Sequence, residues 1–141
     1  MSERSITEAT PRPWLIRAVL LSSVVGLIHL IMTPVYFSLW LGYGAFFFLA
    51  GVAFFTYSAL LAVNPPSRIL FWVGIAASAA TVTLWAITRT VGIPFFGPEA
   101  GMVEPVGIPD LISKVAEVAL IVHLVVLLRW FPQLEQRPLI R

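Results

Sequence analysis

The charged residues of this chain leave two long gaps, which restrict its fold more than any other feature. No Asp, Glu, Lys or Arg occurs at the fifty positions 18–67, or at the twenty positions 69–88. A bilayer-spanning helix needs about 20 mostly apolar residues. The first gap is therefore long enough for two such helices and the second for one more. The composition agrees, because charged residues make up only 11% of the chain, against about 25% in soluble domains.

Several classes of function are excluded by the same composition. The chain has no cysteine, which excludes disulfides, iron–sulfur ligands, a thiol nucleophile and attached c-type haem. Nine basic and seven acidic residues give a net charge of +2, too little for a nucleic-acid surface. A chain of 141 residues also leaves no room for a separate soluble catalytic domain beside the membrane segments.

The apolar segments predict an all-α fold: an integral membrane four-helix bundle that forms a single transmembrane domain over residues 1–141. The expected spans are about 14–32, 39–63, 69–87 and 110–128. Pro34 predicts a turn at Thr33-Pro34, because proline disfavours helix at the residue before it. Trp130 and Pro132 are expected to end the last helix. No small-residue cleavage site follows the first span, so we expect it to be a retained helix and not a signal peptide.

Two spans have a distinctive composition. Small residues from Gly74 to Ala80 fill the third span, and they allow close helix packing in lipid, which predicts a place in the middle of the bundle. In the second span Phe46, Phe47 and Phe48 are adjacent, so they point in three directions and at least one faces lipid or a partner. A groove for a carotenoid or a quinone is the alternative interpretation of this aromatic series.

The connection 88–109 holds four glycines, four prolines and the charged residues Arg89, Glu99 and Glu104. Its other residues are largely apolar, which does not suit a flexible linker. We therefore expect a compact, ordered lid folded onto one end of the bundle.

The basic residues predict the orientation. Seven arginines fall on the side of the two termini, against Arg89 and Lys114 on the other side. Basic residues stay cytoplasmic, so both termini should face the cytoplasm and the lid should face outward. The seven are Arg4, Arg12, Arg17, Arg68, Arg129, Arg137 and Arg141.

A polar cluster is expected beneath the lid. Asp110, Lys114 and Glu117 share one stripe of the fourth helix. Glu117 lies about 10 Å along the helix from Asp110, inside an apolar layer whose half-thickness is about 15 Å. His29 has a similar depth, and Arg89 lies where the third span leaves the membrane.

The structural interpretation of this cluster is an Arg89–Glu117 ion pair that holds the lid, with Lys114 as the competing partner of Glu117. The functional interpretation is a site for a metal ion or a proton. One histidine and a few carboxylates fall short of a tight transition-metal set, so the identity of any metal stays open.

His123 lies about 120° around the helix from Glu117 and has Ala119 four residues before it. This arrangement resembles antenna helices that bind bacteriochlorophyll, so a pigment or haem ligand is one interpretation. A histidine hydrogen-bonded to a neighbouring helix is the other. No cofactor is required by the sequence.

The segment Thr88-Arg89-Thr90-Val91-Gly92-Ile93-Pro94-Phe95, followed by Gly97-Pro98-Glu99-Ala100-Gly101 and Glu104-Pro105, resembles a motif of small uncharacterised four-helix bacterial integral membrane proteins. The resemblance implies a multi-pass protein of the bacterial inner (plasma) membrane. Such proteins tend to have acidic and histidine residues where this chain has Val35 and Tyr36. The resemblance therefore makes a metal or redox role less expected for this chain. It implies no particular activity, because the resembling proteins are uncharacterised.

These observations predict a non-enzymatic accessory or interaction subunit of a bacterial membrane complex. Two observations support this prediction: the aromatic series of the second span, part of which is expected to face lipid or a partner, and the lack of a recognisable combination of catalytic residues. Its expected partners are the lipid bilayer and other membrane subunits or a second copy of itself. A metal-ion or proton-linked site under the lid, serving transport or redox, is the first alternative, and pigment or haem binding through His123 is the second.

Overall fold

The computed structural model describes residues 12–64 and 66–135 and contains four α-helices in these ranges. They are α1 (Arg12–Leu39), α2 (Leu41–Val63), α3 (Arg68–Thr90) and α4 (Ile108–Glu135). All four are long and apolar enough to cross a membrane, which fits a multi-pass membrane protein. The predicted all-helical fold with four such segments is confirmed.

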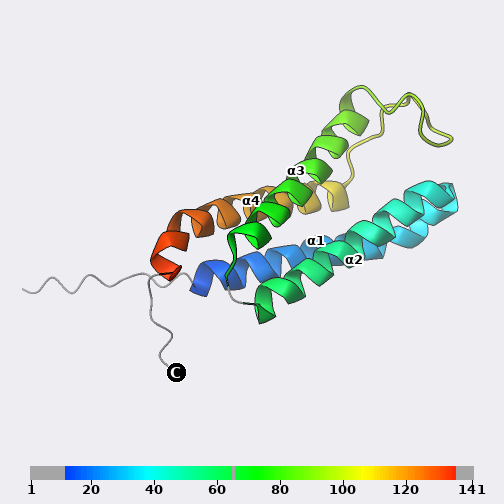
Figure 1. The fold of residues 1–141 in the computed structure, drawn as a ribbon. Coiled ribbons are helices and arrows are strands. Elements are labelled where there is room, and N and C mark those ends of the chain that lie inside the picture. Colours follow the sequence, from blue (N-terminus) through cyan, green and yellow to red (C-terminus); the bar gives the residue numbers. More distant parts are fainter. Residues whose placement is uncertain (1–11, 65, 136–141) are drawn as a thin grey trace, which may run out of the picture.

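The helices form two pairs that are joined through α1 and α4. α1 packs against both α2 and α4, whereas α3 packs along α4. Figure 1 shows the α1–α2 pair below and the α3–α4 pair above it. The spatial order is therefore α2, α1, α4, α3, with α1 and α4 in the interior.

Small residues allow α1 and α2 to approach each other closely. A side chain at Gly26 would meet the carbonyl oxygen of Gly51 at 3.0 Å. Beside these glycines, Ser22 donates a hydrogen bond of 2.8 Å to the carbonyl of Phe54, and Ser58 donates one of 3.1 Å to that of Val19. Small residues and interhelical hydrogen bonds are what hold helices together in lipid.

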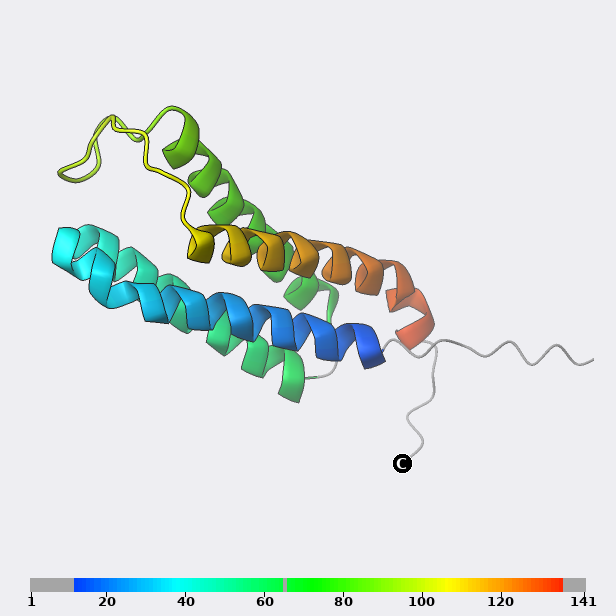
Figure 2. The same ribbon diagram turned by 180° about the vertical axis from the view of Figure 1, so that it is seen from behind.

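The two helix pairs meet at one end and diverge at the other. At the end where α1 begins, here called the Arg12 end, the hydroxyl of Tyr57 in α2 donates a hydrogen bond of 3.0 Å to the carbonyl of Leu70 in α3. Gly74 lets this contact form, because a Cβ there would lie 2.1 Å from the Tyr57 hydroxyl. At the opposite end, here called the Trp40 end, α3 lies apart from α2 (Figures 1 and 2).

The prediction that the third span lies in the middle of the bundle is wrong. α3 is at the edge, with the smallest buried share of the four helices. Ser78 and Gly74 are buried, but Ala76, Ala77, Ala79 and Ala80 are exposed. Small residues run around the whole helix, so composition could not show that only one face has a neighbour.

The predicted turn at Thr33-Pro34 is also wrong, since α1 continues through Pro34 to Leu39. Proline lacks the amide that would bond the carbonyl four residues earlier, here that of Leu30, and membrane helices tolerate such a loss. The Thr33 hydroxyl, just before the proline, donates a bond of 2.8 Å to the adjacent carbonyl of His29. The chain instead reverses at Trp40, whose backbone is extended.

Pro132 does not end the last helix as predicted, because α4 continues to Glu135. The proline lies three residues before the end of the helix, where Phe131 packs edge-on against Phe71 of α3 at 6.3 Å. This packing holds the last turns of α4 against α3 across the position of the proline.

Backbone hydrogen bonds hold the connection between α3 and α4, residues 91–107, folded back on itself and against the end of α3. The amide of Gly101 donates to the carbonyl of Ile93 at 2.8 Å, and the amide of Glu104 donates to that of Thr88 at 3.1 Å. At its base Gly92 has φ 69°, a conformation that favours glycine. Toward its tip, Phe96 contacts the Trp40 end of α1–α2.

Candidate functional site

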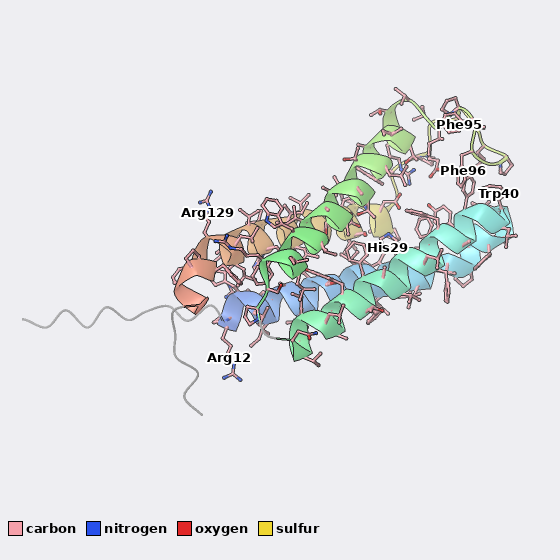
Figure 3. All side chains as sticks on the ribbon, in the orientation of Figure 1. Arg12, His29, Trp40, Phe95, Phe96 and Arg129 are labelled. Atoms are coloured by element: carbon pink, nitrogen blue, oxygen red, sulfur yellow. The ribbon has the colours of Figure 1, made fainter. Side chains whose placement is uncertain are left out.

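A cavity of about 690 Å³ lies between the two diverging helix pairs at the Trp40 end. All four helices and the 91–107 connection contribute to its wall. Figure 3 shows that His29 lies between the two pairs, whereas Arg12 and Arg129 are at the far end of the molecule. The polar lining residues are His29, Tyr36, Tyr43, Thr81, Trp85, Thr88, Arg89, Glu99, Glu104, Asp110, Ser113 and Lys114.

Arg89 joins the end of α3 to the start of α4. Its guanidinium donates to Glu104 and, at 2.6 Å, to Asp110, and its side chain is only 7% exposed. Asp110, the third residue of α4, also accepts a bond of 3.2 Å from the amide of Gly107 just before the helix, the contact that an acidic residue makes at this position of a capping box.

The predicted Arg89–Glu117 ion pair is therefore wrong. α3 and α4 run antiparallel, and Thr81 of α3 contacts Glu117 of α4. Eight residues further along α3 is Arg89, and seven residues back along α4 is Asp110, so these two residues meet. Arg89 thus reaches the first turn of α4, and Glu117 lies two turns deeper.

Glu117 is completely buried and has three partners. Lys114 donates to it at 2.5 Å, Thr81 at 2.7 Å and Ser113 at 3.0 Å. Glu117 is therefore paired with Lys114, the alternative partner that the sequence analysis gave beside Arg89. A buried carboxylate in an apolar layer is costly, and this shell supplies both a counter-charge and two hydroxyl donors.

His29 lies in the wall of the cavity, as its predicted depth implies. Its Nδ1–H donates a hydrogen bond of 2.9 Å to the carbonyl of Val25, and its ring packs 5.4 Å from that of Phe47. The cavity is thus lined by His29 from α1, by Arg89 from α3, and by Asp110 and Lys114 from α4. Glu117 lies behind Lys114 and does not line it.

The described residues contain no group of three or more His, Asp or Glu side chains placed to hold a metal ion. Glu104 and Asp110 bind Arg89, and Glu117 binds Lys114. Three of the four carboxylates in or directly behind the wall are thereby engaged in ion pairs. Glu99 also lines the cavity, from the connection.

Sequence reasoning missed several residues of this wall. Thr81 and Ser113 complete the shell of Glu117, and Ser113 lies one helical turn before it, a spacing that could have identified it. Trp85 lies one turn before Arg89 on α3 and was identifiable in the same way. The contact of Thr81 with Glu117 crosses between helices, and no local spacing signals it.

Aromatic rings form much of the α1–α2 side of the cavity. Tyr36 and Phe47 stack at 3.7 Å with 11° between their planes, and Phe46 meets Phe47 edge-on at 5.8 Å. Phe46 and Phe48 are exposed, and Phe47 is half-buried. The three adjacent phenylalanines therefore point in different directions, as predicted.

Two hydrogen-bond donors on residues that line the cavity have no partner in the part of the chain that the structure describes, and both nitrogen atoms are buried, without a surface that faces the cavity. They are Nε1 of Trp85 and Nε of Arg89; the third such buried atom, the hydroxyl of Ser78, lies outside the cavity. The other guanidinium nitrogens of Arg89 are bonded. Both free donors thus belong to residues one turn apart on α3.

His123 does not line the cavity. Its Nδ1–H donates to the carbonyl of Ala119 at 2.7 Å, and the ring of Trp14 from α1 lies 4.9 Å away. The hydrogen bond is within α4, so the predicted bond to a neighbouring helix is not the one observed, although α1 does pack on the ring. The pigment or haem interpretation stays a prediction.

Comparison with protein-family models, with curated proteins and with solved structures finds no match to this chain. The resemblance to small bacterial four-helix membrane proteins therefore stays a prediction, and the function has to be argued from the site itself.

Proposed function

We propose that this protein is a non-enzymatic membrane protein that binds a small amphipathic molecule in the cavity at the Trp40 end. The observation that carries this proposal is the cavity itself, about 690 Å³ in volume, because ligand pockets typically measure roughly 300–1,000 Å³. Its wall combines aromatic and aliphatic side chains with polar ones, and apolar surface with polar groups at fixed positions is what a small-molecule site offers.

The 91–107 connection serves as the lid of this site. The Tyr43 hydroxyl donates a hydrogen bond of 2.9 Å to the carbonyl of Phe96, and the Trp40 ring meets that of Phe96 edge-on at 4.9 Å. These contacts tie the connection to the α1–α2 pair, while Arg89 ties its other side to α3 and α4. Figure 3 shows Phe96 beside Trp40, with Phe95 farther from it.

The ion pairs support a structural role for the charged groups. Arg89 and Lys114 are both engaged by carboxylates, and Glu117 has no exposed surface. Glu99 lines the cavity outside these ion pairs, but the described residues contain no group of three or more His, Asp or Glu side chains that could hold a metal ion with it. Binding of a small molecule therefore accounts for the cavity better than a metal or proton site does.

The proposed location is the inner membrane of a bacterium, with both termini cytoplasmic and the lid outward. Arg12, Arg17, Arg68 and Arg129 lie toward the Arg12 end, whereas Arg89 and Lys114 lie toward the other. The rule that basic residues stay cytoplasmic supports this orientation.

A second candidate function, that of an accessory or interaction subunit, is supported by the outer face of α3. Ala76 and Ala80 are exposed and four residues apart, and small residues at this spacing favour packing against another transmembrane helix. Cysteines placed at positions 76 and 80 should cross-link to a neighbouring chain in native membranes. If they form no cross-link and the protein purifies without a partner, this second function is wrong.

Native mass spectrometry of gently purified protein tests the binding function. We expect one bound small molecule per chain, and we expect Leu84→Trp to lose it, because Leu84 lines the cavity. Thr83→Trp is the matched control, since Thr83 is exposed on the same helix and does not line the cavity.

Equal retention of the bound molecule by Leu84→Trp and Thr83→Trp would contradict the proposal, and so would wild-type protein without any bound molecule. Both variants should keep the wild-type unfolding temperature within a few degrees, which separates loss of the site from loss of the fold.

A further inference from the structure

We infer that the ligand of this cavity has an uncharged headgroup that donates a hydrogen bond, in its simplest form an alcohol, and that Nε2 of His29 accepts this bond. The inference rests on the proposed binding function and specifies the chemistry of its ligand.

The hydrogen bond of Nδ1 determines which atom of the His29 ring is left for a ligand. The Val25 carbonyl, 2.9 Å from Nδ1, can only accept, so Nδ1 carries the hydrogen and Nε2 of the neutral ring is an acceptor. Nδ1 is thereby held against the backbone of its own helix. Nε2 lies at the end of the ring that is farther from this backbone, so it is directed away from α1.

Nε2 of His29 is an acceptor without a partner at the wall of the cavity. His29 is only 4% exposed and lines the cavity, and Figure 3 shows it between the two helix pairs. No described residue donates to Nε2, yet this atom is not one of the three unpartnered atoms that are closed off from any surface. The surface that Nε2 keeps therefore faces the cavity. A molecule there that donates a hydrogen bond satisfies this acceptor, as buried polar groups require.

The charges around His29 favour an uncharged donor. Glu117, Lys114 and Asp110 lie close enough to act on the ring. The two carboxylates are bonded to Lys114 and to Arg89, and not to the ring. A charged headgroup at Nε2 would thus be buried without a free counter-charge, which is costly. The same holds for a protonated ring, so this arrangement supports the neutral, accepting form of His29.

Glu99 lines the cavity outside these ion pairs, but at another level. It belongs to the 91–107 connection, whose Phe96 contacts α2 at Tyr43. The His29 ring lies against residues 47–54 of α2, about one to three turns further along that helix. An ammonium group bonded to His29 would therefore lie below the level of this carboxylate.

The test measures the affinity of the purified protein for four probes with similar tails. They are decanol, decylammonium, decanoate and nonyl methyl ether, an isomer of decanol that keeps the oxygen acceptor and has no donor. Binding is followed by the rise in unfolding temperature with probe concentration. We expect decanol to bind about fivefold more tightly than the ether, the effect of one neutral hydrogen bond. We expect it to bind at least about tenfold more tightly than the two charged probes.

His29→Phe removes the acceptor and keeps an aromatic ring against α2. We expect it to weaken decanol binding about fivefold and to leave binding of the ether unchanged within about twofold. The matched control is His123→Phe. The His123 ring makes the same Nδ1 contact one turn back, with the Ala119 carbonyl at 2.7 Å, but it does not line the cavity. The control should leave the binding of all four probes unchanged.

Nitrogen-15 NMR of histidine-labelled protein tests the contact in the wild-type chain, so the result does not depend on how well a variant folds. The His123→Phe variant assigns the signals of the two histidines. We expect decanol, and not the ether, to shift the Nε2 resonance of His29, while that of His123 stays in place. An Nε2 resonance of His29 that is the same with and without bound decanol would overturn the inference.

The outcomes separate this inference from the proposed function. If no probe binds, the binding function itself is wrong. If the ether binds as tightly as decanol, or if His29→Phe and His123→Phe behave alike, the binding function stands and the His29 contact is wrong. If decylammonium or decanoate binds most tightly, the binding function stands and the uncharged headgroup is wrong.

Discussion

Arg89 at the end of α3 and Asp110 at the start of α4 form a buried ion pair, with Nη2 of the guanidinium 2.6 Å from the carboxylate. Glu104 binds the same guanidinium from the connection between the two helices. One side chain therefore links the end of α3, the 91–107 connection and the first turn of α4, and its counter-charges come from Glu104 and Asp110 and not from Glu117.

Replacement of Arg89 by alanine should destabilise the protein in detergent by about 3–5 kcal/mol, because it leaves two carboxylates without a counter-charge. A double-mutant cycle measured by thermal unfolding identifies the partner. Arg89→Ala and Asp110→Asn should couple by about 0.5–3 kcal/mol, whereas Arg89→Ala and Glu117→Gln should be additive within about 0.5 kcal/mol. Additivity with Asp110 and coupling with Glu117 would reverse the assignment.

Lys114 and Glu117 should behave as a second, separate unit. Lys114→Met leaves the carboxylate of Glu117, which has no exposed surface, without its cation, so a loss of about 3–5 kcal/mol is expected. The double variant Lys114→Met with Glu117→Leu removes both charges and should be less destabilised than Lys114→Met alone. A double variant as unstable as the sum of the two single variants would show that they are not paired.

Gly44 should be intolerant of any side chain, because the reversal between α1 and α2 brings Phe37 against it. A Cβ at Gly44 would lie 2.2 Å from the Phe37 ring and 2.7 Å from its Cα. Gly44→Ala should therefore destabilise by about 1–3 kcal/mol, although alanine otherwise stabilises a helix by about 1 kcal/mol.

The control for this steric prediction is Gly107→Ala, where the nearest atom would lie at 3.5 Å, an ordinary contact. Thermal unfolding of the two variants should differ clearly. Equal stability would mean that the chain does not reverse tightly at Trp40.

The proposed topology predicts which positions a membrane-impermeant thiol reagent reaches. The chain has no cysteine, so single cysteines in place of Ser2, Ala100 and Gln136 can be labelled in intact cells without background. Position 100 should react, and positions 2 and 136 should react only after the cells are opened. Labelling at 2 or 136 but not at 100 would reverse the orientation.

The four helices and the polar character of one end of the bundle could be predicted from the sequence, because hydropathy determines where membrane segments lie. Depth along each helix also predicted that His29 and Glu117 lie near one level. Depth does not determine rotation or register, however. The partner of Arg89 depended on how α3 and α4 align, and neither sequence separation nor depth contains that information.

Local rules also failed where membrane packing outweighed them. Pro34 lies within α1, which continues to Leu39, although proline in a soluble chain would predict a break. The alanines of α3 predicted a central helix, but small residues permit close packing without specifying a neighbour. The cavity itself depends on the divergence of α3 from α2, which no segment of sequence encodes alone.

Photo-labelling in liposomes tests the central claim, that the cavity holds an amphiphile, most directly. The probe is decanol, an uncharged amphiphile, carrying a photoreactive diazirine in its tail, and the labelled residues are mapped by peptide mass spectrometry. We predict labelling at the cavity residues Met32, Leu84 and Phe96, from three different elements, and its loss when excess unlabelled decanol is present. Labelling confined to outward-facing residues such as Ile69 and Val122, and unaffected by the competitor, would contradict the account.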